Sequence, residues 1–264
     1  MTPLAGNFPA LPFDAWSADE YLRDYYSRVE MDEALTLEFA LREAKKIAPG
    51  AAALEFGAGP TAHGLIALSP YVGTFDAADF LHPNLRAIGK WVRKGHDAHD
   101  WRPFVRHILG CEGIHCPTEF QVGAREALAR RRISRLLPCD ASRPCPLGAG
   151  GSRGYDALFT FYCADSATGD KAEWRWYMRN ILSLLIPGGT LIMAALRNCR
   201  AYKVGENWFP GADIDEADLR SALNAAGFIR DQTHIVARDV PGQSCRGYDG
   251  ILLASGRKPQ LKAV

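Results

Sequence analysis

Short apolar runs alternate along this chain with longer segments whose apolar residues recur at helical spacing. The short runs are bounded by glycine, proline and acidic residues, which is the pattern of buried strands. They predict strands over residues 51–56, 71–78, 135–139, 157–163, 190–196, 234–238 and 248–255. The periodic segments predict helices that start at Ser17 and just after Gly59, and helices over residues 31–47, 84–94, 171–185 and 214–226.

This alternation predicts an α/β fold: a Rossmann-like, mostly parallel seven-stranded sheet with helices on both faces. The last two strands are joined by a short Pro/Gly loop, so we expect them to form an antiparallel C-terminal hairpin. Residues 1–48 precede the first strand as an N-terminal helical lid, and residues 95–135 form an insertion. We expect a single domain over residues 1–264, without internal repeats.

Composition and charge exclude several classes of protein. Of the 264 residues, 47% are hydrophobic and 23% are charged, and the net charge is +1. A chain of this kind has no global attraction to nucleic acid or to an acidic membrane. The N-terminus lacks a signal-peptide pattern, and the apolar stretch 181–196 is interrupted by Pro187-Gly188-Gly189. We therefore expect a cytoplasmic protein without a nucleic-acid or membrane partner. Because the sequence shows no exposed coiled coil or swapped element, we expect a monomer.

The seven cysteines are an odd number at irregular spacings, which favours reduced thiols. Cys111, His115 and Cys116 lie close together in the sequence, but no second paired cluster completes four ligands. We expect no metal.

The segment Leu54-Glu55-Phe56-Gly57-Ala58-Gly59-Pro60-Thr61 is the most informative in the chain. A strand ends at an acid and two glycines then open a turn, where the backbone can approach a ligand closely. Further acids follow the other predicted strands, at Asp79, Asp140 and Asp165. Because ligands of open parallel sheets bind at the carboxyl ends of the strands, these acids are expected to lie around one site.

The spacing of these acids suits a nucleoside. Asp79 lies twenty residues beyond Gly59, where an acid can accept hydrogen bonds from both ribose hydroxyls, and Asp140 could accept one from an adenine amino group. Pro60 removes a backbone N–H that a pyrophosphate would use, and no third glycine follows. A ligand with adenine, ribose and an amino-acid tail fits better, namely S-adenosyl-L-methionine.

With these residues the chain resembles the small-molecule methyltransferases that include nicotinamide, phenylethanolamine and indolethylamine N-methyltransferases. The matching motifs span nearly the whole chain: Tyr21-Leu-Arg-Asp-Tyr25-Tyr26, the Gly-Ala-Gly-Pro-Thr turn at 57–61, Asp79-Phe-x-x-x-Asn84, Asp100-Trp101-x-Pro103, Cys139-Asp140, Phe161-Tyr162-Cys163-Ala164-Asp165, Pro187-Gly188-Gly189 and Tyr202-Lys-Val-Gly205-Glu206. The paired tyrosines and the Gly-Pro-Thr ending are unusual among methyltransferases in general.

The resemblance implies that one set of residues binds the cofactor. This set comprises Tyr21, Tyr26, Glu55, Gly57, Gly59, Thr61, His63, Asp79, Phe80, Asn84, Asp140, Ala141 and Tyr162. Tyr21 and Tyr26 would lie over the methionine end, and His63 stands where the family often has a tyrosine near the carboxylate. Asp79 would bind ribose, and Asp140 with Ala141 would hold adenine.

The resemblance also implies an acceptor site. Asp165 and Tyr21 are the catalytic candidates, since a carboxylate can orient an amine and receive its proton. A helix N-cap is the alternative role for Asp165. Tyr202 would wall the acceptor pocket. The chain has Ala194 and Arg197 at positions where relatives have acids. If Arg197 points into the pocket, it favours an acceptor with an acidic group; if it points outward, it gives no information about the acceptor.

The sequence thus predicts a methyltransferase acting on the nitrogen of a small amine or heteroaromatic acceptor. Sulfur or oxygen methylation of a small molecule is an alternative, because thioether-methylating members share the motifs. An NAD-dependent oxidoreductase is less favoured, given Pro60 and the lack of a Tyr-x-x-x-Lys pair. A macromolecular methyltransferase and a non-catalytic cofactor-binding protein are further alternatives.

Overall fold

The computed structural model describes residues 13–148, 151 and 154–260. Its centre is a seven-stranded sheet in the order β3-β2-β1-β4-β5-β9-β8. The neighbouring strands from β3 to β5 pair in parallel, whereas β9 is antiparallel to both β5 and β8. The predicted fold class is confirmed, including the C-terminal hairpin. The strands are β1 Ala52–Phe56, β2 Thr74–Asp79, β3 Ile133–Pro138, β4 Tyr155–Phe161, β5 Leu185–Leu196, β8 Thr233–Asp239 and β9 Gly250–Arg257.

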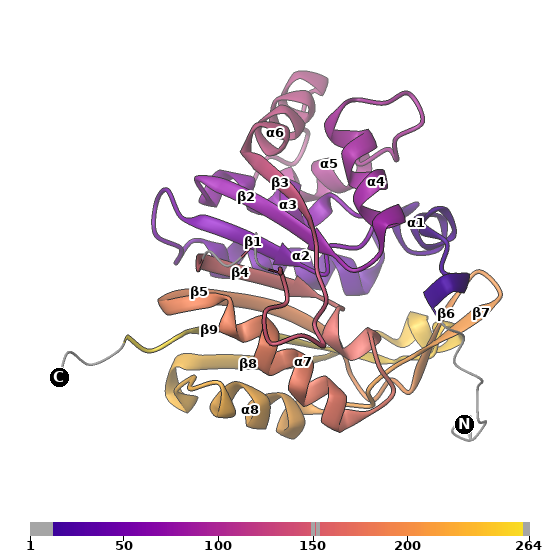
Figure 1. Cartoon of the computed structure of the whole chain (residues 1–264). Helices are drawn as coiled ribbons and strands as arrows, with labels where there is room; N and C mark the ends of the chain where they lie inside the picture. The colour runs from indigo at the N-terminus through magenta and orange to yellow at the C-terminus, as the bar shows by residue number, and fades with distance from the viewer. Residues whose placement is uncertain (1–12, 149–150, 152–153, 261–264) are drawn as a thin grey trace.

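Helices cover both faces of the sheet (Figure 1). One hydrophobic core lies under the helices of the first half of the chain, and a second lies under the two helices of the second half. The first group is α1 Ala18–Tyr26, α2 Met31–Ala44, α3 His63–Leu68, α4 His82–Val92, α5 Arg102–Cys111 and α6 Glu119–Arg132, and the second is α7 Lys171–Ser183 and α8 Glu216–Ala225. The described residues between β3 and β4 form no helix.

The lid contains the two helices that the sequence predicts, and the insertion contains two helices for which the sequence predicts no bounds. In the lid, Ser17 caps α1 by accepting the backbone N–H of Glu20, and α2 packs on α3, β5 and β9. The first twelve residues of the predicted lid lie outside the described residues. The insertion folds as α5 and α6, which pack on each other and on α3. These segments therefore belong to the same packed body as the sheet.

Two predictions about the second half need correction. The Pro187-Gly188-Gly189 turn lies within β5, which begins at Leu185, because an irregularity in the β4–β5 pairing absorbs it. The segment 197–212, for which the sequence predicts neither a helix nor a strand, contains a hairpin of β6 Ala201–Val204 and β7 Asn207–Pro210. Gly205 lies in its turn with φ +58°, a conformation that glycine adopts without strain. The hairpin places Tyr202 beside the lid.

None of the helices that the structure describes has the length and apolar character needed to span a membrane.

Candidate functional site

A cavity of about 390 Å³ lies at the carboxyl ends of the parallel strands, beneath the N-terminal lid. The segments that follow β1, β2, β3 and β4 all contribute to its wall, together with Leu196 at the end of β5. Trp16 and the tyrosines of α1 close it from above. Both the position, where a parallel sheet binds ligands, and the size suit a small-molecule site.

The glycine turn brings the backbone to the floor of this cavity. Gly57 has φ +73°, and a Cβ added there would lie 2.1 Å from Sγ of Cys163. The N–H groups of Gly57 and Ala58 both donate to the carbonyl of Ala78, at 2.8 and 3.0 Å. These bonds tie the turn to β2. Position 57 therefore has space only for glycine. Gly57 itself lines the cavity.

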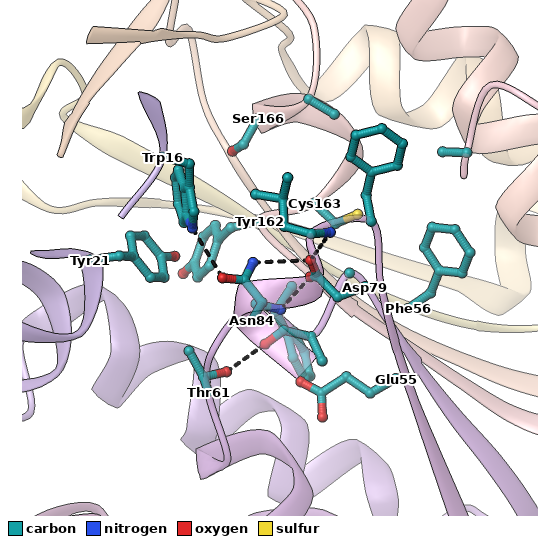
Figure 2. Close-up of a pocket in the computed structure, with 18 of the residues that line it drawn as sticks. Trp16, Tyr21, Glu55, Phe56, Thr61, Asp79, Asn84, Tyr162, Cys163 and Ser166 are labelled. Carbon is teal, nitrogen blue, oxygen red and sulfur yellow. Dashed lines mark hydrogen bonds between the residues drawn. The ribbon is translucent and has the colours of Figure 1, made fainter. Parts of the chain in front are cut away.

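Asp79 connects the turn to the helix that follows β2. Its Oδ2 accepts the Gly59 N–H at 2.7 Å, and its Oδ1 accepts the Leu81 N–H at 2.8 Å and Nδ2 of Asn84 at 3.0 Å (Figure 2). Trp16 Nε1 in turn donates to Asn84 Oδ1 at 3.0 Å. Burial raises the pKa of Asp79, although these hydrogen bonds oppose the shift. The carboxylate is held rigidly and still lines the cavity, as a ribose-binding acid must.

Asp140 and Ala141 line the cavity just past the end of β3. Asp140 accepts hydrogen bonds from Ser142 and from Nε of Arg143. Burial tends to raise its pKa, but these bonds outweigh burial and lower it. Asp140 is therefore an ionised acceptor at neutral pH.

Aromatic side chains form the roof. The ring of Tyr21 lies 4.8 Å from Trp16, 5.0 Å from Tyr25 and 5.4 Å from Tyr26, measured between centroids. Trp16 also contacts Phe209 of β7 at 5.2 Å. These contacts join the lid to the β6–β7 hairpin, and both elements shield the cavity from solvent.

Three buried ionisable side chains lie under the roof without complete hydrogen bonding. Oε2 of Glu33 is 3.0 Å from Nε2 of His63, and its Oε1 accepts the hydroxyl of Tyr26. The 3.0 Å contact lacks hydrogen-bond geometry, so both His63 nitrogens and Oε2 of Glu33 and of Glu55 are without a hydrogen-bond partner. Burial lowers the pKa of His63, but the nearby carboxylates of Glu33, Glu55 and Asp32 together outweigh burial and raise it. The His63 imidazole could donate to a carboxylate, and Oε2 of Glu33 and of Glu55 could accept from an ammonium group. Together they match a zwitterionic amino acid, such as the methionine part of S-adenosylmethionine.

Most of the residues predicted from the sequence lie together in this cavity. Those that line it are Tyr21, Tyr26, Glu55, Gly57, Gly59, Thr61, His63, Asp79, Phe80, Asn84, Asp140, Ala141, Tyr162 and Tyr202.

Asp165 does not line the cavity. It is 3% exposed, and its Oδ2 accepts the Leu196 N–H at 2.8 Å, so it fixes the end of β5. Burial raises its pKa to about 6. The alternative role as a helix cap is also wrong for α7, because Asp170 caps that helix. The geometry makes Asp165 a residue that positions the cavity wall, in place of the predicted contact with the amine.

Arg197 points away from the cavity, which corrects its predicted role in binding the acceptor. Its guanidinium forms ion pairs with Asp239 and, at 3.6 Å, with Glu216. The argument for an acceptor with an acidic group therefore fails.

Sequence reasoning missed several lining residues, chiefly Phe13, Trp16, Asp32, Glu33, Ser166 and Tyr248. The two acids had a detectable signal: they share a helix with Leu37 and Phe39, and an acid on an apolar face is unusual. Tyr248 had none, since it was simply the first residue of a predicted strand.

Known proteins match this chain over most of its length. The model of the NNMT/PNMT/TEMT family matches residues 12–259. Nicotinamide N-methyltransferase of Sus scrofa is 27% identical, over 78% of this chain and 76% of its own. Indolethylamine N-methyltransferase of Mus musculus is 26% identical, over 90% and 91% respectively. Phenylethanolamine N-methyltransferase of Rattus norvegicus is 29% identical, over 81% and 74%.

Solved structures share the fold. The 1,6-didemethyltoxoflavin-N1-methyltransferase of Burkholderia thailandensis, with bound 1,6-didemethyltoxoflavin and S-adenosylhomocysteine, has a TM-score of 0.53 and 16% identity, covering 98% of this chain and 95% of its own. The N-methyltransferase NodS of Bradyrhizobium japonicum in complex with S-adenosyl-L-homocysteine has a TM-score of 0.51 and 16% identity, covering 88% and 90%.

Proposed function

Because this chain belongs to the NNMT/PNMT/TEMT family and is an S-adenosylmethionine-dependent N-methyltransferase of small amines, we propose that its catalytic centre is the cavity beneath the lid. The observation that carries this assignment is the hydrogen bond from the Gly59 N–H to Asp79. It places a buried acid beside the glycine turn, whose backbone lines the cavity. The names of the relatives favour nitrogen over sulfur or oxygen as the methylated atom.

Different residues around the cavity would bind different parts of the cofactor. Asp79 would hold the ribose, with Asn84 and Phe80 beside it, and Asp140 with Ala141 would hold the adenine. Cationic His63 suits the methionine carboxylate, and the unpaired oxygens of Glu33 and Glu55 suit its ammonium group. Thr61, whose hydroxyl donates to the Ala58 carbonyl at 2.7 Å, fixes the turn below them.

When bound, S-adenosylmethionine supplies an activated methyl group on sulfur. The protein's contribution is alignment of the acceptor nitrogen and exclusion of water, and both are worth most when the site is rigid. Tyr202 lines the acceptor end, and its hydroxyl donates to the Ser166 carbonyl at 3.2 Å. Tyr21 lies in the roof between Trp16 and Tyr26, where it can contact both the cofactor and the acceptor and hold them in position.

We also propose that the protein works as a monomer with reduced thiols, as in the cytoplasm. In support, all seven cysteines are free, and four of them are exposed: Cys111, Cys116, Cys145 and Cys245. Neither nucleic acid nor a membrane is needed as a partner.

Formation of S-adenosylhomocysteine tests the proposed function. The protein is incubated with S-adenosylmethionine and, one at a time, arylalkylamines, pyridines and thioethers, and the product is quantified by chromatography. We expect formation that depends on an amine. Product formed equally without an acceptor, or only with thioethers, would contradict N-methylation.

A further inference from the structure

The charged side chains that line the cavity are almost all acidic. Its described wall contains five carboxylates, those of Asp32, Glu33, Glu55, Asp79 and Asp140, but no lysine or arginine. His63 is its one basic side chain, and its Nε2 lies 3.0 Å from Oε2 of Glu33. If the cofactor uses the last four acids as proposed above, Asp32 is left for the acceptor.

Asp32 is a buried carboxylate without a cationic partner. It lies in the first turn of α2 and is 3% exposed. Its Oδ2 accepts the hydroxyl of Tyr248 at 2.6 Å, and its Oδ1 accepts the Glu33 N–H at 3.0 Å and Nε2 of Gln243 at 3.4 Å. All three donors are neutral, and no side chain in the described ranges forms an ion pair with Asp32. Burial raises its pKa, as expected for a carboxylate whose charge is not compensated.

The aromatic groups around the same end of the cavity have already used their polar atoms. Trp16 donates to Asn84, Tyr25 donates to the Lys203 carbonyl at 2.7 Å, and Tyr202 and Tyr248 donate to Ser166 and Asp32. The ring of Tyr25 is already covered by the Arg246 guanidinium, whose carbon lies 4.4 Å from the ring centroid. Trp16, Tyr202 and Tyr248 can still offer a ligand their electron-rich rings. Rings of this kind attract cations, and most strongly where water is excluded.

We propose that Asp32 and the rings of Trp16, Tyr202 and Tyr248 form a subsite for an alkylammonium group, so that the preferred acceptor is an aliphatic amine that binds as a cation. A fixed anion with aromatic walls selects for positive charge and against carboxylates, because an anion would leave Asp32 uncompensated and add repulsion. A neutral heteroaromatic ring gains only the aromatic contacts. This inference rests on the proposed function, since it assigns the part of the cavity that the cofactor leaves open.

Ligand pairs that differ in charge test the subsite without requiring turnover. The full-length protein is saturated with S-adenosylhomocysteine and titrated, by calorimetry, with phenethylammonium, benzyltrimethylammonium, 2-phenylethanol, pyridine and pyridine-3-carboxylate. Benzyltrimethylammonium cannot be methylated, so it reports binding alone. We expect both cations to bind at least tenfold more tightly than the alcohol and the pyridine, and the carboxylate to bind least.

The variant Asp32→Asn assigns the preference to this residue. It should lower the affinity for both cations at least tenfold and leave the affinities for 2-phenylethanol and S-adenosylhomocysteine unchanged. Asp97→Asn, which alters an exposed acid paired with Lys90, is the matched control and should change none of these values. Equal binding of cations and neutral ligands by the wild type, or an unchanged cation preference in Asp32→Asn, would overturn the proposal.

If Asp32→Asn does not fold, Tyr202→Leu takes its place. Loss of the cation preference in this variant supports the aromatic subsite, and an unchanged preference contradicts it. Failure of the proposed function would look different, because S-adenosylhomocysteine itself would then not bind.

Discussion

The backbone N–H of Gly59 donates to Oδ2 of Asp79 at 2.7 Å, although the two residues are twenty positions apart and follow different strands. This bond joins the turn that approaches the cofactor to the acid proposed to hold its ribose. The Leu81 N–H and Asn84 occupy the other oxygen, so the carboxylate has one orientation before any ligand arrives. A site with this rigidity loses little entropy on binding.

The first prediction concerns Asp79 as the cofactor's anchor. Asp79→Ala should weaken binding of S-adenosylhomocysteine more than tenfold, about 1.4 kcal/mol, because it removes the acceptor for the ribose and loosens Gly59. Isothermal titration calorimetry measures this, with Asp97→Ala as the exposed control. An affinity equal to that of the wild type would remove Asp79 from the cofactor site.

A second prediction concerns Gly57. Gly57→Ala should abolish cofactor binding and destabilise the fold, since the new Cβ would meet Sγ of Cys163 at 2.1 Å. The matched control is Gly113→Ala, where φ is also positive, at +94°, but nothing lies within 4 Å. That control carries only the backbone cost of about 1–2 kcal/mol. Urea unfolding of both variants compares the steric effect with the backbone effect. Similar losses of unfolding free energy in the two variants would refute the predicted clash with Cys163.

Burial of Glu55 predicts a pH-dependent stability. Burial raises the pKa of Glu55 from 4.5 to about 7; nearby His63 lowers it and Glu33 raises it. The folded protein therefore holds a proton between these pH values that the unfolded chain has lost, so stability falls as pH rises from about 4.5 to 7. The full shift corresponds to about 3 kcal/mol.

Glu55→Gln tests this linkage, because the amide cannot ionise. The variant should match the wild type near pH 4.5 and be more stable at pH 8, as measured by urea unfolding at each pH. Glu206→Gln, at a side chain that is 94% exposed, serves as the control. A difference that is the same at both pH values would mean that Glu55 is not protonated in the folded state.

The structure changes what is expected of Asp165. Since its carboxylate accepts the Leu196 N–H and does not line the cavity, Asp165→Asn should keep most of the turnover, because the amide oxygen can accept the same bond. Asp165→Ala should lose about 1–3 kcal/mol of stability by leaving that N–H unpaired. Thermal unfolding and turnover are measured on both variants. A large loss of turnover in Asp165→Asn, with normal stability, would restore Asp165 as a catalytic residue.

Arg197 should have little effect on the acceptor. Its ion pairs with Asp239 and Glu216 are partly exposed, so Arg197→Ala should cost at most about 1 kcal/mol of stability. The KM values for a cationic and an anionic acceptor should both stay within twofold of the wild type. A selective rise in KM for the anionic acceptor would show that Arg197 reaches it.

Much of the fold and part of the site could be predicted from the sequence, because local patterns encode them. The apolar run before Gly57 and the acid after the next strand are both local signals, and their meeting follows from the topology of parallel sheets. The direction of Arg197 could not be predicted, since it depends on partners in α8 and β8. Nor could the role of Asp32, because its contacts with Gln243 and Tyr248 join residues more than two hundred positions apart.

The β6–β7 hairpin was missed for a related reason. Each strand has only four residues, and the alternation of apolar side chains is too short to distinguish it from a loop. Its position depends on contacts of Phe209 with Phe13 and Trp16, from the other end of the chain.

The most direct test of the central claim is to locate a transferred methyl group. The protein and Asp79→Ala are incubated in parallel with methyl-labelled S-adenosylmethionine and an arylalkylamine, and tandem mass spectrometry identifies the labelled atom. The account predicts label on the amine nitrogen with the wild type and at least tenfold less with the variant. Label on another atom, or equal labelling by both proteins, would contradict an N-methyltransferase centred on this cavity.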